Sequence, residues 1–483
     1  MRYFIFILIS YFSFVTILFS ELTNGLILYS NSQGIGPSNT YIINNNYNTI
    51  NTWHHSIGAI GIPYLNQDGS IILQFRSSDH FFGNTHGPVG GIFKKLDWNG
   101  NVLWSNHFFN EQFQPHHDIE VLPNGNILII AWEKKSYQDA QSVGRIDIVN
   151  EIWPLVIYEI EPVATNEINI IWEWHLWDHL IQDVDSNLIN YGQVSDHPEL
   201  IDINIGQFTE PSGGDWLHTN AIAYNNELDQ IVFSSKHFNE VFIIDHSTTS
   251  EEAASHQGGN SNKGGDILYR WGNPKNYNRG NITDQKLNAQ HGVHWIPIGM
   301  PGSGNLLIYN NNPTDTTGLN NSFGNSSVVE IITPLDSNGN YYIELDSAYG
   351  PVDYHWEYGG DNSFFSSFQS GAYRLQNGNS FITVSQERRL FEIDSSGNIM
   401  WEYDFENHSH HLGYTARAMK YDLDYLETIN GDLSRDFLIN IFDLLIASDL
   451  LLDEEYVEFG DLNDDNYINI EDINSIINLI MNF

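Results

Sequence analysis

The chain has 483 residues, 13% of them aromatic, and its 61 acidic and 19 basic side chains give a formal charge of −42. Length and aromatic content together indicate a packed globular protein and exclude a disordered one, while the negative charge argues against nucleic acid or an anionic membrane surface as a partner. The sequence has no cysteine, which excludes disulfides, a thiolate nucleophile and thiolate metal ligands.

Residues 1–20 have the order of a secretory signal peptide. Arg2 precedes an uncharged, mostly apolar run from Tyr3 to Phe19, and a polar segment follows. A membrane anchor is the alternative, because the run is slightly shorter than a spanning helix. We therefore expect an exported protein that is periplasmic, cell-surface or secreted, with no membrane insertion after the signal is removed.

Residues 21–427 are predicted to form many short hairpins. Glycine-bearing turns recur between β-rich runs, as in LPNGNILII at 122–130 and LQNGNSFITV at 375–384, and Asn-Gly before alternating apolar residues is a strong hairpin signal. Repeated hairpins with aromatic residues favour a β-propeller, in which radial repetition protects the sheet edges, over a double-sheet sandwich. The tryptophans expected to close the blades are Trp104, Trp172, Trp271, Trp356 and Trp401. Their uneven spacing predicts long insertions around 174–215 and 246–290.

Three histidines stand at comparable places in separate hairpins. The segments are HDIEVLP from His117, HTNAIAY from His218 and HGVHWIP from His291, and each histidine comes six residues before a proline or tyrosine. Equivalent positions of successive propeller repeats form a ring around the axis, so we expect the three imidazoles to converge. The comparable segment from Ser370 lacks the histidine, so the ring is not a feature of every repeat.

Two further polar residues accompany the second histidine. Asn220 follows it closely, and Lys236 lies where the same hairpin returns. Three imidazoles, an amide and an ammonium suit either zinc or an oxyanion with several oxygens. The lysine favours the oxyanion, because a cation beside a metal is unfavourable but helps to bind sulfate, phosphate or carboxylate. His175, His179 and His294 are expected to be structural.

The tail changes character from about residue 428. GDLSRDFLINIFDLLIASDLLLDEE is followed 29 residues later by GDLNDDNYINIEDINSIINLIMNF, and each copy joins an acidic loop to an apolar helical stripe. Oxygen-bearing side chains fall at positions 1, 3, 5 and 12 of a calcium loop. They are Asp461, Asn463, Asp465 and Asp472 in the second copy, and Asp432, Ser434, Asp436 and Asp443 in the first. The sequence predicts Ca²⁺ at these loops; the alternative is two solvated helix starts.

This tandem resembles a type I dockerin, a small calcium-dependent docking module. The resemblance implies a small α-helical, EF-hand-like calcium-loop domain over 428–483 and a cohesin-like protein as a possible partner. The tail departs from the dockerin pattern at Asn466, which replaces the usual glycine, and at Phe437, which stands at the turn of the first loop. Asparagine tolerates the left-handed backbone that glycine normally adopts, so Asn466 is compatible with a metal site in the second loop. Phe437 is not a usual residue at such a turn, so the first loop has the weaker claim to a metal.

The middle of the chain resembles the bacterial aryl-sulfate sulfotransferase family. The resemblance covers roughly residues 50–425 and is carried by IIWEWHLWDHLIQD, SDHPELIDIN, DWLHTNAIAYNNELDQIVFSSKHF, IIDHSTTSEEAASHQGGNSNKGGDILYRWGNP and AQHGVHWIP. It implies an all-β fold, a six-bladed β-propeller. It also implies transfer of a sulfuryl group from a phenolic sulfate donor to a phenol acceptor, with no nucleotide sulfate and no catalytic cofactor.

The resemblance further implies a two-step reaction through a sulfohistidine. The family's nucleophile falls on His291, its histidine and asparagine after a tryptophan fall on His218 and Asn220, and its early histidine falls on His117 rather than His116. His218 is then expected to hold the oxyanion and Asn220 to orient the substrate, while His117 is either a second clamp or the acid and base for the phenol oxygens.

One position departs from the family. Its arginine on the returning strand is Lys236 here, and a point charge cannot hold two sulfate oxygens as a planar fork does. The alternatives to an exported sulfotransferase are a non-catalytic propeller that binds sulfated glycans or phenolics, and a propeller oxidoreductase with a quinone cofactor.

Overall fold

The computed structural model describes residues 21–32, 34, 36–79, 81–82, 87–147, 150–206, 214–312, 324–337, 339–406, 413–426, 431–434, 439–453, 455–463 and 465–481. The expected signal segment at 1–20, the domain boundary placed at 427–428, and Asp436 and Phe437 lie outside these ranges. None of the helices within the ranges is long and apolar enough to cross a membrane.

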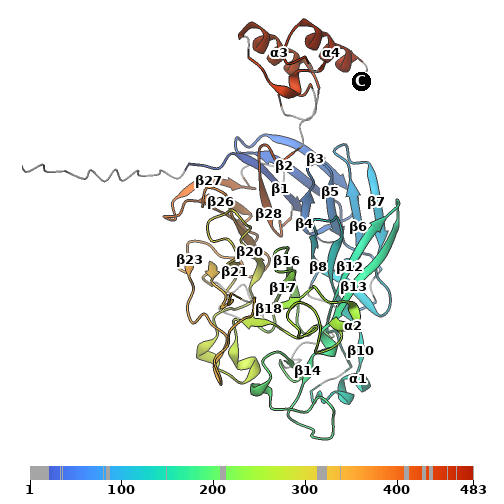
Figure 1. Ribbon diagram of the computed structural model, residues 1–483, viewed down its shortest axis with the longest axis vertical. Helices are drawn as coiled ribbons and strands as arrows, with labels where there is room; N and C mark the ends of the chain where they lie inside the picture. The colour runs from blue at the N-terminus through green and yellow to red at the C-terminus, as the bar shows by residue number, and fades with distance from the viewer. Residues whose placement is uncertain are drawn as a thin grey trace, which may run out of the picture.

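Six four-stranded antiparallel sheets surround a central axis in the described part of the chain (Figure 1). From the innermost strand outward, the first is β4 (Ala59–Leu65), β5 (Ile71–Phe75), β6 (Ile92–Leu96) and β7 (Val102–His107). The second is β8 (Phe113–Val121), β9 (Ile127–Glu133), β12 (Leu155–Val163) and β13 (Glu167–His175). The third is β16 (Thr219–Asn225), β17 (Gln230–Ser235), β18 (Glu240–Asp245) and β19 (Tyr269–Trp271).

The fourth and fifth sheets repeat this order. They are β20 (His291–Trp295), β21 (Leu306–Asn310), β22 (Ser327–Ile331) and β23 (Trp356–Gly359), and then β24 (Gly371–Arg374), β25 (Ser380–Val384), β26 (Arg389–Ile393) and β27 (Ile399–Asp404). The all-β, six-bladed propeller expected from the sequence is confirmed.

Strands from both ends of the chain build the sixth blade. Its innermost strand β28 (Ala418–Asp422) pairs with β1 (Gly25–Asn31), which continues to β2 (Ser38–Asn44) and β3 (Thr49–His55). Leu26 lies opposite Tyr421, and Leu28 opposite Met419. This pairing closes the ring, because the last strand of the propeller completes the blade that the first three strands begin.

The core lies between neighbouring blades. Middle strands such as β9, with the sequence ILIIAWE, read as continuous apolar runs because blades cover both of their faces. Ile72, Phe93, Ile119 and Ile129 form one such layer between the first and second blades. The five predicted closing tryptophans each lie on the outermost strand of a blade, namely β7, β13, β19, β23 and β27.

The long insertions predicted from the tryptophan spacing are also present, and they extend the molecule at one end (Figure 1). One follows β13 and contains the 3-10 turn η1 (Leu176–Asp178), β14 (Leu180–Ile181), η2 (Val194–Asp196) and β15 (Ile201–Asp202). Another follows β18 and contains α2 (Ser250–Ala253), while η3 (Pro274–Tyr277) and η4 (Ile282–Asp284) follow β19. A short excursion in the second blade holds β10 (Lys135–Ser136), α1 (Tyr137–Ser142) and β11 (Glu151–Ile152).

The tail is helical, as its periodicity predicted. The turn η5 (Glu458–Gly460) stands between α3 (Ile441–Asp453) and α4 (Ile470–Met481). Their shared core contains Ala447, Ile473 and Ile476. Figure 1 shows this helical pair as a small body beside the propeller.

Candidate active site

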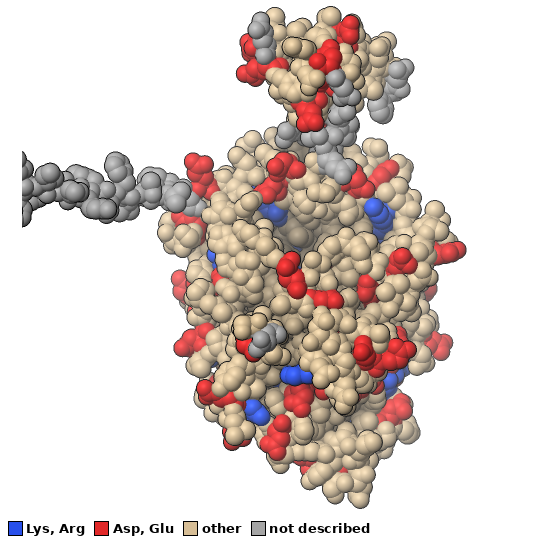
Figure 2. Space-filling model, in the orientation of Figure 1, with Lys and Arg blue, Asp and Glu red and all other residues tan. Residues whose placement is uncertain are grey.

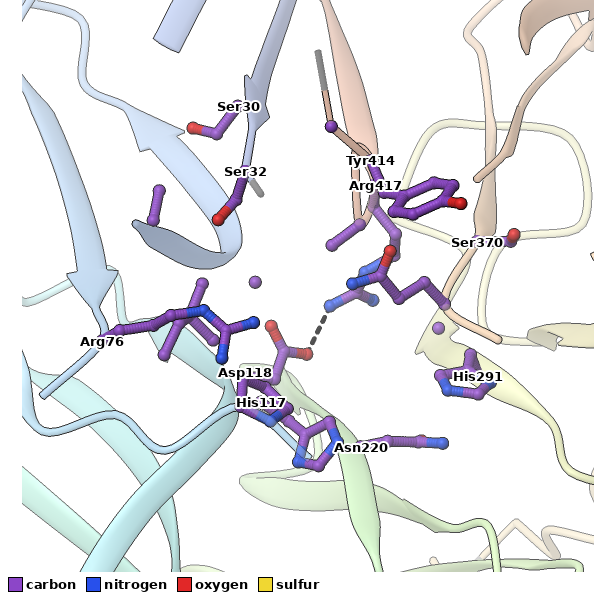
Figure 3. Close-up of a pocket in the computed structure, with 18 of the residues that line it drawn as sticks. Ser30, Ser32, Arg76, His117, Asp118, Asn220, His291, Ser370, Tyr414 and Arg417 are labelled. Carbon is purple, nitrogen blue, oxygen red and sulfur yellow. Dashed lines mark hydrogen bonds and ion pairs between the residues drawn. The ribbon is translucent and has the colours of Figure 1, made fainter. Parts of the chain in front are cut away.

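A cavity of about 560 Å³ lies where the inner strands of the propeller meet. Each of the six blades, or the segment leading into it, contributes to its wall, through Ser30, Ile60, His117, Asn220, His291 and Ser370 among others. Figure 3 shows the His291 ring reaching inward from one wall and the Arg76 guanidinium from the opposite wall. Three of the five predicted catalytic residues therefore line one central cavity.

The other two predicted residues adjoin this group. The ring of His218 lies 4.6 Å from that of His117, measured between centroids. Lys236 follows β17, and its backbone N–H donates to the carbonyl of His218 at 3.2 Å. Residues from three blades, far apart in the sequence, are thus brought together as the ring hypothesis expected.

Bulges at the inner strands set the histidine positions. The strand register shifts between Pro115 and Ile119 in β8, and comparable shifts occur near the starts of β16 and β20. His117 has φ of 48°, His218 of 52° and Ser370 of 80°, so these three share the left-handed backbone expected of one register. At the third histidine the left-handed residue is Gly292, with φ of 64°, so His291 is displaced by one position from the predicted register. A bulge re-aims a side chain, and His291 still reaches the cavity.

Hydrogen bonds fix the tautomer of His291. Its Nδ1 lies 2.8 Å from Oδ1 of Asn311 and 3.0 Å from the carbonyl oxygen of Ala289. The amide nitrogen of Asn311 donates to the carbonyls of Ser366 and Gln369, so its oxygen must face the histidine. Both partners accept, which places the proton on Nδ1 and leaves the lone pair on Nε2.

The ring of His291 is also kept neutral. Burial, together with the nearby Lys236 ammonium, lowers the pKa of His291 to about 3. A neutral imidazole with a free Nε2 lone pair is a competent nucleophile at pH 7.

His218 is oriented by a carboxylate that the sequence reasoning missed. Its Nδ1 donates to Oδ2 of Asp215 at 2.6 Å, and Oδ1 of the same carboxylate accepts from the indole of Trp132 at 2.9 Å. Although burial favours the neutral acid, His218 holds the pKa of Asp215 well below its usual range. Asp215 stands three residues before His218 in DWLH, and that spacing was the available signal.

His117 is neutral and closely packed. Its pKa lies well below the usual range because of burial first and then the charges of His218, His116, His291 and Lys236. Its Nδ1 lies 2.8 Å from Nδ1 of His116, and a Cβ added at Gly87 would come within 2.4 Å of its ring. A histidine with so low a pKa is a poor general acid near pH 7, so this geometry favours a hydrogen-bonding role.

The side chain of Asn220 is held by a hydrogen bond from its amide nitrogen, and its amide oxygen is not used in that bond. Its Nδ2 donates to the carbonyl of Gln290 at 2.8 Å. Its Oδ1 is buried and has no hydrogen-bond partner among the described residues. A buried acceptor that lacks a partner is costly, so this oxygen is suited to accept a bond from a ligand hydroxyl.

Three arginines in the cavity wall were not predicted. They are Arg76, Arg388 and Arg417. Arg417 is paired with Asp118, and Arg388 lies over the ring of Tyr414 at 5.2 Å. Nε of Arg76 is buried and, within the described ranges, has no hydrogen-bond partner. Figure 2 shows acidic side chains spread over the visible face of the molecule and few basic ones. The three arginines therefore gather positive charge in the cavity against the net charge of the chain.

The predicted tail ligands are partly gathered. Carboxylate oxygens of Asp461, Asp465 and Asp472 lie within 4.8 Å of one another, and Asn463 contacts Asp465 at 3.2 Å. In the first loop, Ser434 donates to Asp432 from its hydroxyl and to Asp443 from its backbone N–H. Oxygen-only donor sets of this kind suit a hard cation.

A family model described as Arylsulfotransferase (ASST) matches residues 21–390, well over half of the chain. No curated protein matches the chain.

Solved structures show only distant likeness. A Bacteroides caccae protein of unknown function is 12% identical over 82% of this chain and 99% of its own, with a TM-score of 0.43. A periplasmic gluconolactonase of Pseudomonas aeruginosa is 8% identical over 82% of this chain and 99% of its own, with a TM-score of 0.41. A Staphylococcus aureus virginiamycin B lyase is 10% identical over 80% of this chain and 88% of its own, with a TM-score of 0.35.

Proposed function

The chain belongs to the arylsulfotransferase family and is therefore a transferase, and we propose that it moves a sulfuryl group from a phenolic sulfate ester to a phenol through a sulfohistidine at His291. The observation that carries the proposal is the fixed tautomer of this buried ring. Asn311 and Ala289 accept from Nδ1, which leaves the Nε2 lone pair free to attack. The absence of a phosphate-loop motif from the sequence fits a donor other than a nucleotide sulfate.

In the first half-reaction, Nε2 of His291 attacks the sulfur of the donor. The N–S bond forms while the bond from sulfur to the phenol oxygen breaks, and the phenolate leaves with that electron pair and takes a proton from solvent. Positive charge develops on the imidazole, and the two acceptors at Nδ1–H stabilise it.

In the second half-reaction, the oxygen of an acceptor phenolate attacks the sulfur. The N–S bond breaks and returns its electrons to Nε2, which restores the neutral ring. The acceptor phenol has given its proton to solvent beforehand, so the protons of the two halves balance. Oδ1 of Asn220 is available to orient the acceptor hydroxyl before it ionises.

Charge on the transferred group is met by the surrounding donors. In sulfuryl transfer, as in phosphoryl transfer, charge spreads over the equatorial oxygens while nucleophile and leaving oxygen lie in line. We assign His218, with its Asp215 partner, and Lys236 to these oxygens, and His117 to the phenolate oxygen as a hydrogen-bond donor. Arg76 is assigned to capture of the anionic donor, because its guanidinium reaches into the cavity (Figure 3).

The cavity mouth supplies a surface for the aryl ring. The ring of Tyr414 lines the cavity, is 41% exposed and lies edge-on to Phe368 at 5.1 Å between centroids. Aromatic rings in such offset and edge-to-face arrangements stabilise each other beyond simple area burial. Both substrates are aromatic, so the same surface serves donor and acceptor in turn.

Release of 4-nitrophenol from 4-nitrophenyl sulfate, with and without added phenol, tests this function. We expect phenol to stimulate release by the native chain and His291→Ala to lose the stimulated release. His294→Ala is the matched control, because His294 is equally buried, lies three residues away and is absent from the cavity wall. Equal release by the native and His291→Ala chains would remove His291 from the mechanism.

We propose further that the chain is exported and that its tail is a dockerin-like, calcium-binding module with a cohesin-like partner. The gathered carboxylates of Asp461, Asp465 and Asp472 support the second loop as a Ca²⁺ site. Bound Ca²⁺ would neutralise these charges and hold the loop at the start of α4. Chelation of the full chain, followed by calorimetry, tests this part separately from catalysis.

A further inference from the structure

A cluster of two histidines and a carboxylate lies in the insertions, apart from the catalytic cavity. Oδ1 of Asp266 is 2.8 Å from Nδ1 of His179 and 2.7 Å from Nδ1 of His256. His179 comes from the insertion after β13, and the other two residues come from the insertion after β18. The cluster therefore joins two segments that are separate in the sequence, and none of its members lines the cavity.

The tautomer of His179 makes the contact between its Nδ1 and Oδ1 of Asp266 unusual. Its Nε2 lies 2.8 Å from the carbonyl oxygen of Ala253, which can only accept, so Nε2 carries the proton. In the neutral ring Nδ1 then presents a lone pair to a carboxylate oxygen at 2.8 Å. Two acceptors at this distance repel each other unless a proton or a cation lies between them.

His179 cannot turn away from the carboxylate. Its side chain is fully buried, and its ring stacks on Trp174 with centroids 5.5 Å apart and planes 5° from parallel. The backbone behind it is equally tight, because a Cβ added at Gly265 would lie 2.0 Å from the carbonyl oxygen of Ala253 and 2.6 Å from Nε2 of His179. The imidazole is thus held with Nδ1 toward Asp266.

We propose that His179, His256 and Asp266 bind a divalent transition metal ion of the zinc class. A ligating histidine normally donates its other N–H to a carbonyl or carboxylate, as His179 does to Ala253. Two imidazoles with one carboxylate favour such an ion over Ca²⁺, which prefers oxygen ligands. Tetrahedral coordination at zinc distances places donor atoms about 3.3 Å apart, so each histidine nitrogen needs to move only about half an ångström away from the carboxylate oxygen.

The open side of the cluster provides access. The His256 side chain is 61% exposed, which leaves room for the ion to enter and for water to complete the coordination. A metal here would fasten the two insertions to each other. This is a structural role, independent of the proposed sulfuryl transfer.

Cobalt binding to the full-length, chelator-treated protein tests the site, because tetrahedral Co²⁺ absorbs visibly and Zn²⁺ displaces it. The titration is done in excess Ca²⁺, so that the tail carboxylates do not compete for the probe. His256→Ala removes an exposed ligand without opening the core. His197→Ala is the control, since His197 is 46% exposed and hydrogen-bonded to Glu199 in the same insertion.

We expect one Co²⁺ per chain with visible bands that Zn²⁺ abolishes, and at least about tenfold weaker binding in both His256→Ala and Asp266→Asn. His197→Ala should bind as the native chain does. Absence of binding by the folded native protein, or equal binding by the native and His256→Ala chains, would overturn the proposal. The cluster would then be a proton-bridged histidine–aspartate pair.

Discussion

Asp215 accepts a hydrogen bond of 2.6 Å from Nδ1 of His218 through Oδ2, while Oδ1 accepts from the indole of Trp132. The two bonds hold the carboxylate in one orientation, and the carboxylate in turn holds the imidazole with Nε2 facing away from it. A buried carboxylate so placed also stabilises positive charge on the ring, which suits His218 to hold a sulfuryl oxyanion.

Asp215→Asn should lower kcat for phenol-stimulated transfer by about 10²- to 10⁴-fold, because an amide can present N–H to His218 and stabilise the wrong tautomer. Steady-state kinetics with 4-nitrophenyl sulfate measures this effect. Asp229→Asn is the matched control, since Asp229 accepts from His246 at 2.7 Å outside the cavity. An Asp215→Asn enzyme as active as the native one would exclude His218 as an oriented clamp.

Lys236→Met should lower kcat/KM for the donor by about 10²- to 10³-fold, the usual cost of losing one preorganised oxyanion donor. Lys236→Arg should retain most of the activity or exceed it, because the planar guanidinium can bind two sulfate oxygens. Comparing Lys236→Met with Lys236→Arg separates the effect of the positive charge from the effect of the side-chain shape. Unchanged kinetics in Lys236→Met would show that the ammonium contributes nothing to transfer.

The pH profile of kcat/KM for the donor should lack an acid limb near 6.5. The pKa of His291 is lowered to about 3 by burial and Lys236, so the nucleophile stays neutral as the pH falls through 6.5. On the alkaline side, burial lowers the pKa of Lys236, so activity should decline below the usual lysine pKa. Profiles measured where the protein remains folded test both limbs, and a loss of activity with an apparent pKa near 6.5 would contradict the assignment.

Stability should fall as the pH drops from about 6.5 toward 4. Burial lowers the pKa values of His116 and His291 to about 3 and those of His55 and His294 to about 4. Between these values and the unfolded pKa near 6.5, the unfolded chain binds more protons, so acid favours unfolding. Urea unfolding at several pH values measures the slope. His294→Gln should flatten it, and an unchanged slope would show that His294 does not contribute.

The fold was largely predictable because its signals are local. Asn-Gly turns mark the hairpins, and the five tryptophans fall on outermost strands. The closure of the ring was not predictable in this way. The pairing of β1 with β28 joins residues about 400 positions apart, and nothing in the turn chemistry of either strand specifies its partner.

The residues of the candidate site also fall into two groups: those that local repeats made predictable and those that depend on the closed ring. The convergence of His117, His218 and His291 was predictable because repeats place comparable residues around one axis, although a bulge displaces His291 by one residue. Arg76 and Arg417 were missed because an arginine near the end of a strand has no periodic signature. Their place in the cavity depends on which blades become neighbours, a property of the closed ring.

Calcium should raise the melting temperature of the tail in the full chain, since a ligand that binds only the folded state stabilises it by mass action. Asp465→Ala should remove this dependence, because Asp465 is exposed and supplies one of the gathered carboxylates. Asp449→Ala, on the exposed face of α3, should leave it intact. Calorimetry with Ca²⁺ or chelator distinguishes these outcomes, and a melting temperature that does not respond to Ca²⁺ would contradict the calcium assignment.

The most direct test of the central claim is to mix the protein with excess 4-nitrophenyl sulfate without an acceptor, quench it at alkaline pH, and map the peptides by mass spectrometry. The account predicts one equivalent of 4-nitrophenol in a burst and the added mass of one SO₃ group on the peptide that contains His291, lost again when the remaining donor is removed and phenol is added before quenching. A modified peptide elsewhere, or phenol-stimulated turnover with neither burst nor adduct, would contradict transfer through His291.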